Sequence, residues 1–200
     1  MSLQIILASA SPRRKELLAQ INVTPIIHPV DLDETPLPDE QPLAYVQRLA
    51  AEKSALCAAT LNDKSATILN SDFPVLAADT AVVIDNRILG KPRDQEDGIA
   101  MLSLLSGRTH QVYTALSLRG RQHWQMVSVT DVTFRSLTEV EMLAYWRTEE
   151  PSDKAGGYAI QGLGSLFIES INGSYSGVMG LPLFETAELL EKQGIHLLYE

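Results

Sequence analysis

The sequence predicts an α/β fold in which helices flank a mixed, twisted sheet. Strand-like and helix-like segments alternate along all 200 residues, without repeats or low-complexity tracts. Hydrophobic residues make up 45% of the chain and charged residues 20%, as in an ordinary globular protein. We therefore expect one domain over residues 1–200, built as two lobes with no separate linker.

The first elements are a strand and a helix. The apolar run at 5–8 predicts the strand, and "KELLAQI" continues after it at helical spacing. Ser11 stands at the expected N-cap, and Pro12 takes the first helical position. The prolines of residues 24–42 then indicate extended chain or loop, because each one disfavours helix in the residue before it.

A long helix is predicted over 43–59, because apolar side chains recur along one face. This stripe consists of Leu43, Val46, Leu49 or Ala50, and Cys57. The polar stretch 60–71 is expected to form a surface connection. Residues 73–92 predict two strands joined by a hairpin turn at Asp85 and Asn86.

The remaining segments continue the alternation of helices and strands. A helix is expected to end at Gly107 in a left-handed conformation, and Thr138 with Glu141 forms a capping box for another. The expected ranges are a helix at 95–107, strands at 110–118 and 124–134, a helix at 139–148, a strand at 166–171, a helix at 183–193 and a final strand.

Charge and composition limit the classes of partner. The formal net charge of −9 would repel a phosphate backbone, so we expect no nucleic-acid polymer as partner. The single cysteine excludes an internal disulfide and suits a reducing compartment. The opening residues lack the basic region of a signal peptide, and no apolar run is long enough for a membrane span. We expect a cytoplasmic protein with no membrane partner.

Arg13 and Arg14 indicate an anion site. They lie in the first turn of the predicted helix, where the dipole is positive and cations are unfavourable. A phosphate held by Ser11, helix N–H groups and a guanidinium would repair the arrangement. The alternative is a pair of solvated surface arginines. The preceding strand favours a site, because ligands of open α/β sheets bind beyond the carboxyl ends of strands.

Five further residues are candidates for chemistry, each with a simpler alternative. Asp79 interrupts a buried-looking run and needs a cation, a metal or a catalytic task, unless it is a turn aspartate. Lys53 falls on the apolar stripe, where most lysines only extend to the surface. Lys91, before a proline that fixes the local chain, could aim its amine at phosphates, or it is an exposed turn lysine. Glu34 could contribute to a metal site, or its acidic loop is only solvated. Gln161 among glycines suits a nucleobase edge or a loop brace.

Taken in order along the chain, these segments resemble the Maf family of nucleotide pyrophosphatases, also called septum formation inhibitor-like proteins. The resemblance covers nearly the whole chain and is highly specific as an ordered set. It rests on "SASPRRKELL", "DLDE", "RLAAEKS", "AADTAVV", "LGKPRD", "MLSLLSGRTHQVYTA", "DVTFRSLT", "EPSDKAGGYAIQGLG" and "INGSYSGVMGLPLFET". The segment "DKAGGYAIQG" most resembles the branch that hydrolyses dTTP and UTP. "SGVMGLP" departs slightly from the commoner "NVVGLP".

The resemblance implies a cleft between two lobes, as in inosine triphosphate pyrophosphatases, and often a homodimer. It also implies that Asp79 is the proton acceptor and that Arg13, Thr80 and Gln161 govern substrate choice. The other residues expected to line the cleft are Ser9, Arg14, Glu34, Lys53, Lys91 and Lys154. The predicted reaction is water attack on the α-phosphorus of a nucleoside triphosphate, which releases the monophosphate and pyrophosphate, with Mg²⁺ or Mn²⁺ held by Glu34 and Asp79. The expected role of the cations Arg13, Arg14, Lys53 and Lys91 is to hold the phosphate oxygens and stabilise the charge on the leaving group.

Two alternatives belong to other functional classes. "DLDET" imitates the nucleophile motif of haloacid-dehalogenase-type phosphatases, with Asp31 as nucleophile and Asp33 as acid/base. The prolines before it argue against the buried strand that such a motif follows. The second alternative is a non-catalytic nucleotide-binding regulator of cell division.

Overall fold

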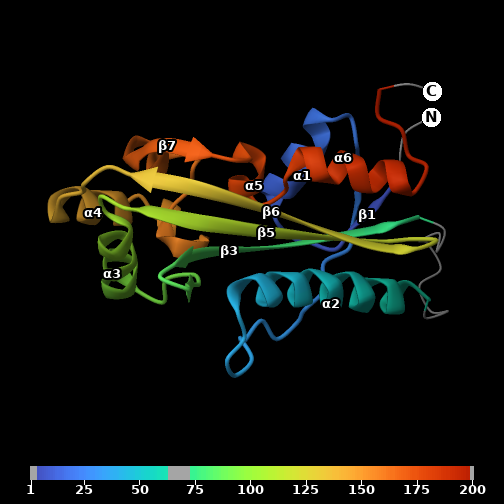
Figure 1. Ribbon diagram of the computed structural model, residues 1–200, viewed down its shortest axis with the longest axis horizontal. Coiled ribbons are helices and arrows are strands. Elements are labelled where there is room, and N and C mark those ends of the chain that lie inside the picture. The colour runs from blue at the N-terminus through green and yellow to red at the C-terminus, as the bar shows by residue number, and fades with distance from the viewer. Residues whose placement is uncertain (1–3, 63–72, 199–200) are drawn as a thin grey trace.

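The computed structural model describes residues 4–62 and 73–198, which form a mixed sheet of seven strands with helices on both faces (Figure 1). The strands are β1 (Ile6–Leu7), β2 (Ile26–Ile27), β3 (Val75–Ile84), β4 (Arg87–Leu89), β5 (Thr109–Arg119), β6 (His123–Phe134) and β7 (Ile168–Asn172). Their order is β2-β1-β3-β5-β6-β7, with β4 beside β3. The two pairings of β1 are parallel and the others antiparallel, which confirms the predicted mixed α/β sheet.

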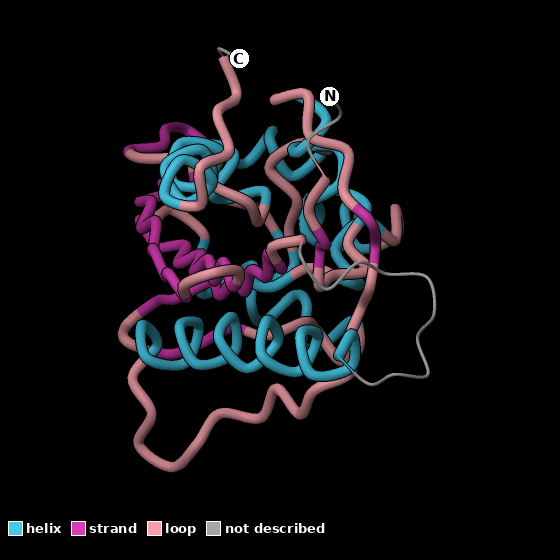
Figure 2. Tube along the Cα trace, turned by 90° about the vertical axis from the view of Figure 1, so that its right-hand side faces the viewer, coloured by secondary structure: helices cyan, strands magenta, loops and turns pink. Residues whose placement is uncertain are grey.

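The helices divide between the two faces of the sheet. They are α1 (Pro12–Gln20), α2 (Pro42–Asn62), α3 (Gln95–Leu105), α4 (Glu139–Trp146), α5 (Tyr175–Met179) and α6 (Leu183–Lys192). Short 3₁₀ helices span Glu150–Asp153, Ala155–Gly157 and Leu163–Phe167. Helix α2 runs along one face, while α1, α5 and α6 lie on the other (Figures 1 and 2). Within the described residues, no helix is both long and apolar enough to cross a bilayer.

The pairing of β3 leaves part of one edge open. One edge pairs with β5 from Val75 to Val83. The other edge pairs with β1 only at Val75 and Leu76, and with β4 only from Val82 to Ile84. Among the described strands, none pairs with this second edge between Leu76 and Val82. Backbone and side chains in this gap can therefore face a cavity.

The apolar core is divided at the same place on both faces of β3. Side chains alternate between faces along a strand. On one face, Leu76 and Ala78 pack in a different apolar cluster from Val82 and Ile84; on the other, Val75 and Ala77 pack apart from Ala81 and Val83. Thr80 lies at the division on the first face and Asp79 at the division on the second. The two polar residues thus occupy the boundary between apolar clusters.

Several local predictions are confirmed. Asp85 and Asn86 form the hairpin turn, with φ of 50° and 61°, and Gly107 adopts a φ of 68° after α3. Thr138 and Glu141 form both hydrogen bonds of a capping box at the start of α4. These features depend on residues close together in the sequence, which is why the pattern predicts them.

Other predictions are wrong or fall outside the described residues. Residues 195–198 form no strand, because Ile195 and Leu197 instead pack against the apolar cluster that α6 covers. The strand predicted from 166 begins only at Ile168, after a 3₁₀ helix, and the short helix α5 was not predicted. Of the connection expected at 60–71, the first residues end α2, and 63–71 lie outside the described residues. Leu43 is exposed and does not join the stripe.

A buried histidine predicts a pH dependence of stability. His110 on β5 is 2% exposed, and its Nε2 lies 2.8 Å from the Tyr158 hydroxyl oxygen. Burial lowers the pKa of His110 to about 4. Because the unfolded histidine keeps its ordinary, higher pKa, the unfolded state binds more protons below about pH 6.5.

We expect stability to fall by about 2 kcal/mol between pH 7 and pH 5 through this residue. His110→Gln cannot take up a proton in the unfolded state, so it should show a correspondingly smaller fall. Urea unfolding of both proteins at the two pH values measures the difference. Equal falls in the two proteins would contradict the assignment to His110.

Candidate active site

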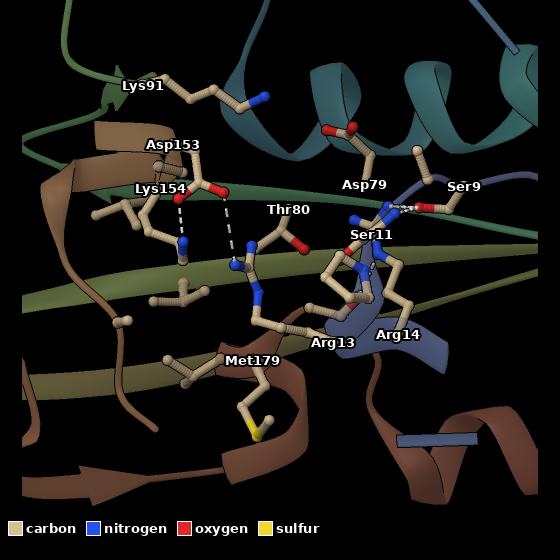
Figure 3. Close-up of a pocket in the computed structure, with 18 of the residues that line it drawn as sticks. Ser9, Ser11, Arg13, Arg14, Asp79, Thr80, Lys91, Asp153, Lys154 and Met179 are labelled. Carbon is tan, nitrogen blue, oxygen red and sulfur yellow. Dashed lines mark hydrogen bonds and ion pairs between the residues drawn. The ribbon is translucent and has the colours of Figure 1, made fainter. Parts of the chain in front are cut away.

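The open edge of β3 borders a cavity of about 460 Å³ (Figure 3). All ten site residues predicted from the sequence line it: Ser9, Arg13, Arg14, Glu34, Lys53, Asp79, Thr80, Lys91, Lys154 and Gln161. Ser9 follows the carboxyl end of β1, as expected for an α/β sheet. The structure thus brings these residues together, while their individual roles stay predictions.

The cavity is locally cationic in a protein whose net charge is −9. Among the described residues, its lining holds five cations and three carboxylates. The cations are Arg13, Arg14, Lys53, Lys91 and Lys154, and the carboxylates are Glu34, Asp79 and Asp153. A confined cationic surface of this kind attracts a compact polyanion.

Lys53 joins two carboxylates that line the cavity. It lies on α2 between Ala50 and Cys57, which pack in separate apolar clusters. Its Nζ is 2.7 Å from Asp79 Oδ1 and 2.5 Å from Glu34 Oε1. Lys53 is 8% exposed and Asp79 is 6% exposed. The alternatives of a surface-seeking lysine and a turn aspartate are therefore wrong, because the two side chains form a buried pair.

Asp79 has the environment of a tuned carboxylate. Burial raises its pKa, while the charge of Lys53 and the hydrogen bond from Lys53 oppose the rise. The net direction is upward, so Asp79 takes up a proton more readily than an ordinary aspartate. A carboxylate of raised pKa that faces a cavity is a candidate general base.

Arg14 is held rigidly at the start of α1. Its Nε donates to the Gly180 carbonyl oxygen at 2.9 Å, and its Nη1 donates to Ser9 Oγ at 3.1 Å. Burial lowers the pKa of Arg14, but an arginine stays protonated in proteins. The alternative of a solvated surface residue is therefore wrong for Arg14. Figure 3 shows Arg13 and Arg14 extending from the same turn.

The amino end of α1 is available to an anion. Ser11 occupies the predicted N-cap position, but its side chain makes no capping hydrogen bond. Instead, the Ser11 N–H donates to Ser9 Oγ at 3.2 Å. The first turn contains no acidic side chain, and Ser11, Pro12 and Arg13 line the cavity. Unpaired N–H groups and the helix dipole therefore face the same space as the cations.

Thr80 has a fixed hydrogen-bonding role on β3. Thr114 on β5 donates to the Gly177 carbonyl oxygen at 2.8 Å, and its Oγ1 lies 3.0 Å from Thr80 Oγ1. Since the Thr114 proton is already used, the Thr80 hydroxyl donates to Thr114. The Thr80 oxygen can then accept a hydrogen bond from a ligand in the cavity.

Asp153 is a lining residue that the sequence analysis missed. It forms an ion pair with Lys154 and another with Arg13 at 4.0 Å (Figure 3). Although burial raises the pKa of Asp153, these cations hold it below its usual value. Its only signal in the sequence was its place beside Lys154, because the contact with Arg13 joins distant segments. Asp153 occupies a position where cations would otherwise meet a ligand anion.

Of the alternative phosphatase motif "DLDET", Glu34 lines the cavity, but the two aspartates that would carry phosphatase chemistry do not. Asp33 Oδ1 accepts a hydrogen bond from the Thr35 backbone at 2.9 Å, and the segment is mostly exposed. Neither Asp31 nor Asp33 lines the cavity. The short β2 ends before the motif, so no buried strand leads directly into it.

The fold and the cavity define an α/β protein with a cationic ligand site. The family model described as "Maf-like protein" matches residues 4–193, and the chain belongs to the Maf family. It is 52% identical over 191 residues to the dTTP/UTP pyrophosphatase of Saccharophagus degradans, covering 95% of this chain and 89% of the relative. It is 50% identical over 194 residues to the dTTP/UTP pyrophosphatase of Methylococcus capsulatus, covering 96% of this chain and 92% of the relative.

The chain is also similar to a solved structure, that of the Staphylococcus aureus Ham1 protein. The TM-score is 0.45 and the sequence identity 17%, over 66% of this chain and 71% of the other.

Asp153 leads to a testable prediction on anion affinity. Asp153→Asn removes the carboxylate that pairs with Arg13 and Lys154, so a ligand anion no longer competes with it. We expect inorganic pyrophosphate to bind roughly two- to fivefold more tightly, the range of a partly exposed ion pair. Isothermal titration calorimetry at fixed ionic strength measures the change.

Asp39→Asn is the matched control, because it removes the same charge from an exposed turn that does not line the cavity. Unchanged or weaker binding to Asp153→Asn would contradict the competition.

Proposed function

We propose that this protein hydrolyses dTTP and UTP to the nucleoside monophosphate and pyrophosphate. The observation that carries the proposal is the buried Lys53, which joins Asp79 and Glu34 within a cation-lined cavity. The similarity to two enzymes that bear the name dTTP/UTP pyrophosphatase supplies the choice of nucleotide. The reaction breaks the bond between the α-phosphorus and the oxygen that bridges it to the β-phosphorus.

The phosphate chain of the substrate lies along the cations. Arg13, Arg14 and the amino end of α1 bind phosphate oxygens at one side of the cavity. Lys91 extends from the loop after β4 along another side (Figure 3). Lys154 adds a charge from the loop before Gln161. Together these groups stabilise the charge that develops on the departing pyrophosphate.

Asp79 acts as the proton acceptor. A water molecule attacks the α-phosphorus, one of its protons passes to an Asp79 carboxylate oxygen, and pyrophosphate leaves. The raised pKa of Asp79 suits this role because a general base works best when its pKa is near the working pH. Lys53 orients the Asp79 carboxylate through their hydrogen bond.

The carboxylates fit a divalent cation that the substrate helps to bind. Within the described residues, no group of three or more His, Cys, Asp and Glu is arranged to hold a metal. Glu34 and Asp79 nevertheless converge on Lys53 Nζ, and Mg²⁺ or Mn²⁺ binds through one or two carboxylates together with substrate phosphates. When bound, this cation would neutralise phosphate charge.

The base of the substrate lies towards Gln161, while the Thr80 hydroxyl lies near Arg14, where a Cβ at Gly180 would come close to both side chains. Gln161 offers an amide donor and acceptor from a loop that lines the cavity, which suits the edge of thymine or uracil.

We further propose a single cytoplasmic domain over residues 1–200 that forms a homodimer. We expect no nucleic-acid polymer as partner, because the net charge of −9 would repel a phosphate backbone.

The test is product analysis of the purified protein with a panel of nucleoside triphosphates and Mg²⁺ or Mn²⁺. We expect pyrophosphate and the monophosphate from dTTP and UTP. Asp79→Asn should lower kcat by about 10²- to 10⁴-fold, since it removes the general base. Asp31→Asn is the matched control and should keep wild-type activity.

Other outcomes would select the alternatives. Release of inorganic phosphate, with activity lost in Asp31→Asn but not in Asp79→Asn, would indicate the phosphatase mechanism. Tight nucleotide binding without any product would indicate the non-catalytic regulator.

A further inference from the structure

Gln161 lines the cavity, but its position is not fixed by contacts of its side chain. Across residues 4–62 and 73–198, no hydrogen bond or ion pair anchors the Gln161 side chain to the protein. It belongs to the loop between two 3₁₀ helices, and the residue itself is exposed. The position of its amide therefore depends on how firmly the loop backbone is fixed.

The Glu150 carboxylate fixes this backbone on the carboxyl side of Gln161. Its Oε2 accepts the Leu163 N–H at 2.9 Å, and its Oε1 accepts the Gly164 N–H at 3.0 Å. The Glu150 side chain reaches the loop from the first 3₁₀ helix and does not itself line the cavity. It can influence a ligand only through the loop.

Tyr145 extends the same network to the amino side of Gln161. Its hydroxyl donates to Glu150 Oε1 at 2.7 Å and accepts the Ala159 N–H at 3.0 Å. The loop is thus held at Ala159 through the tyrosine and at Leu163 directly, with Gln161 between the two points. Tyr145 is buried and packs edge-on against Phe167 at 4.9 Å between ring centroids, so the anchor is rigid.

Two glycines permit this close approach. A Cβ at Gly162 would overlap the Glu150 carboxylate, and one at Gly164 would lie 2.8 Å from the Tyr145 hydroxyl oxygen. Burial raises the pKa of Glu150, but the hydrogen bonds that its carboxylate accepts lower it more, so the group stays ionised. Gly162 and Gly164 therefore leave the room that the Glu150 carboxylate and the Tyr145 hydroxyl need to reach the loop backbone.

We propose that Glu150 is a positioning residue for substrate choice: through Tyr145 and the loop N–H groups, it holds Gln161 where the amide reads the pyrimidine base. This inference rests on the proposed function, because it assumes that a nucleobase binds beside Gln161. A loosened loop lowers the contribution of the base to binding and leaves Asp79 and Lys53 untouched.

Glu150→Gln tests the proposal with almost no change of shape. In the glutamine, an NH₂ group replaces one of the two Glu150 oxygens. The protons of this NH₂ group then face the backbone N–H of Leu163 or of Gly164, and two donors cannot form a hydrogen bond. At least one hydrogen bond to the loop is lost. Glu149→Gln is the matched control, because it removes the same charge from the preceding exposed residue.

The measurement is kcat and KM for UTP and for ATP, from which the ratio of the two kcat/KM values is formed. We expect Glu150→Gln to lower the ratio about tenfold, mainly by raising KM for UTP, as befits a lost hydrogen bond to a charged group. The kcat for saturating UTP should stay within about threefold of wild type, and Glu149→Gln should match wild type throughout.

Gln161→Ala provides the decisive comparison. If Glu150 acts only by placing Gln161, adding Glu150→Gln to Gln161→Ala lowers the ratio no further. Independent, additive losses, or an unchanged ratio in Glu150→Gln, would overturn the proposal. A purely structural role would lower kcat and stability without changing the ratio.

Two checks keep the outcomes distinct. A wild-type protein that releases no pyrophosphate from UTP refutes the proposed function itself, whereas normal turnover with unchanged variant ratios refutes only the role of Glu150. If Glu150→Gln does not fold, Tyr145→Phe keeps the ring against Phe167 and removes only the hydroxyl bridge. That variant should shift the same ratio in the same direction, and an unchanged ratio would overturn the inference.

Discussion

The arrangement of this protein depends on the burial of the Asp79 carboxylate in the middle of β3. An ionised group in such a place is unfavourable unless a partner compensates for its lost hydration. Lys53 supplies the partner from α2, and Glu34 shares it. The pair lies where the apolar clusters on this face separate. The ion pairs of Lys53 therefore hold α2, β3 and the acidic loop of Glu34 together, although apolar packing alone would not favour buried charges there.

The cavity lining has two parts that differ in how their side chains are held. Beside α1, it offers cations and backbone N–H groups, and Arg14 is fixed by the Gly180 carbonyl oxygen and Ser9. Gln161 is held only through its loop, which Glu150 and Tyr145 anchor from outside the cavity. In the proposed function, the first part binds phosphate and Gln161 meets the base.

Local patterns predicted much of the fold and seven of the ten candidate residues, while Ser9, Thr80 and Lys154 came from the family resemblance alone. The stripe of α2 placed Lys53 among buried positions, and the polar break in "VLAADTAVVI" marked Asp79. Part of that success came from the family resemblance. The contacts of Asp153 with Arg13 and of Glu150 with its loop were not predictable, because they join segments that only the folded chain brings together. The prediction of a final strand is wrong for a related reason. Ile195 and Leu197 pack against the apolar cluster that α6 covers and do not pair with the sheet.

The proposed chemistry is tested most directly by carrying out the hydrolysis of dTTP in water enriched in oxygen-18 and analysing both products by mass spectrometry. Attack of water on the α-phosphorus places the heavy oxygen in the nucleoside monophosphate and leaves pyrophosphate unlabelled. Label in pyrophosphate instead would mean attack on the β-phosphorus. That result would contradict the role given to Asp79, whose carboxylate is proposed to activate water beside the α-phosphorus.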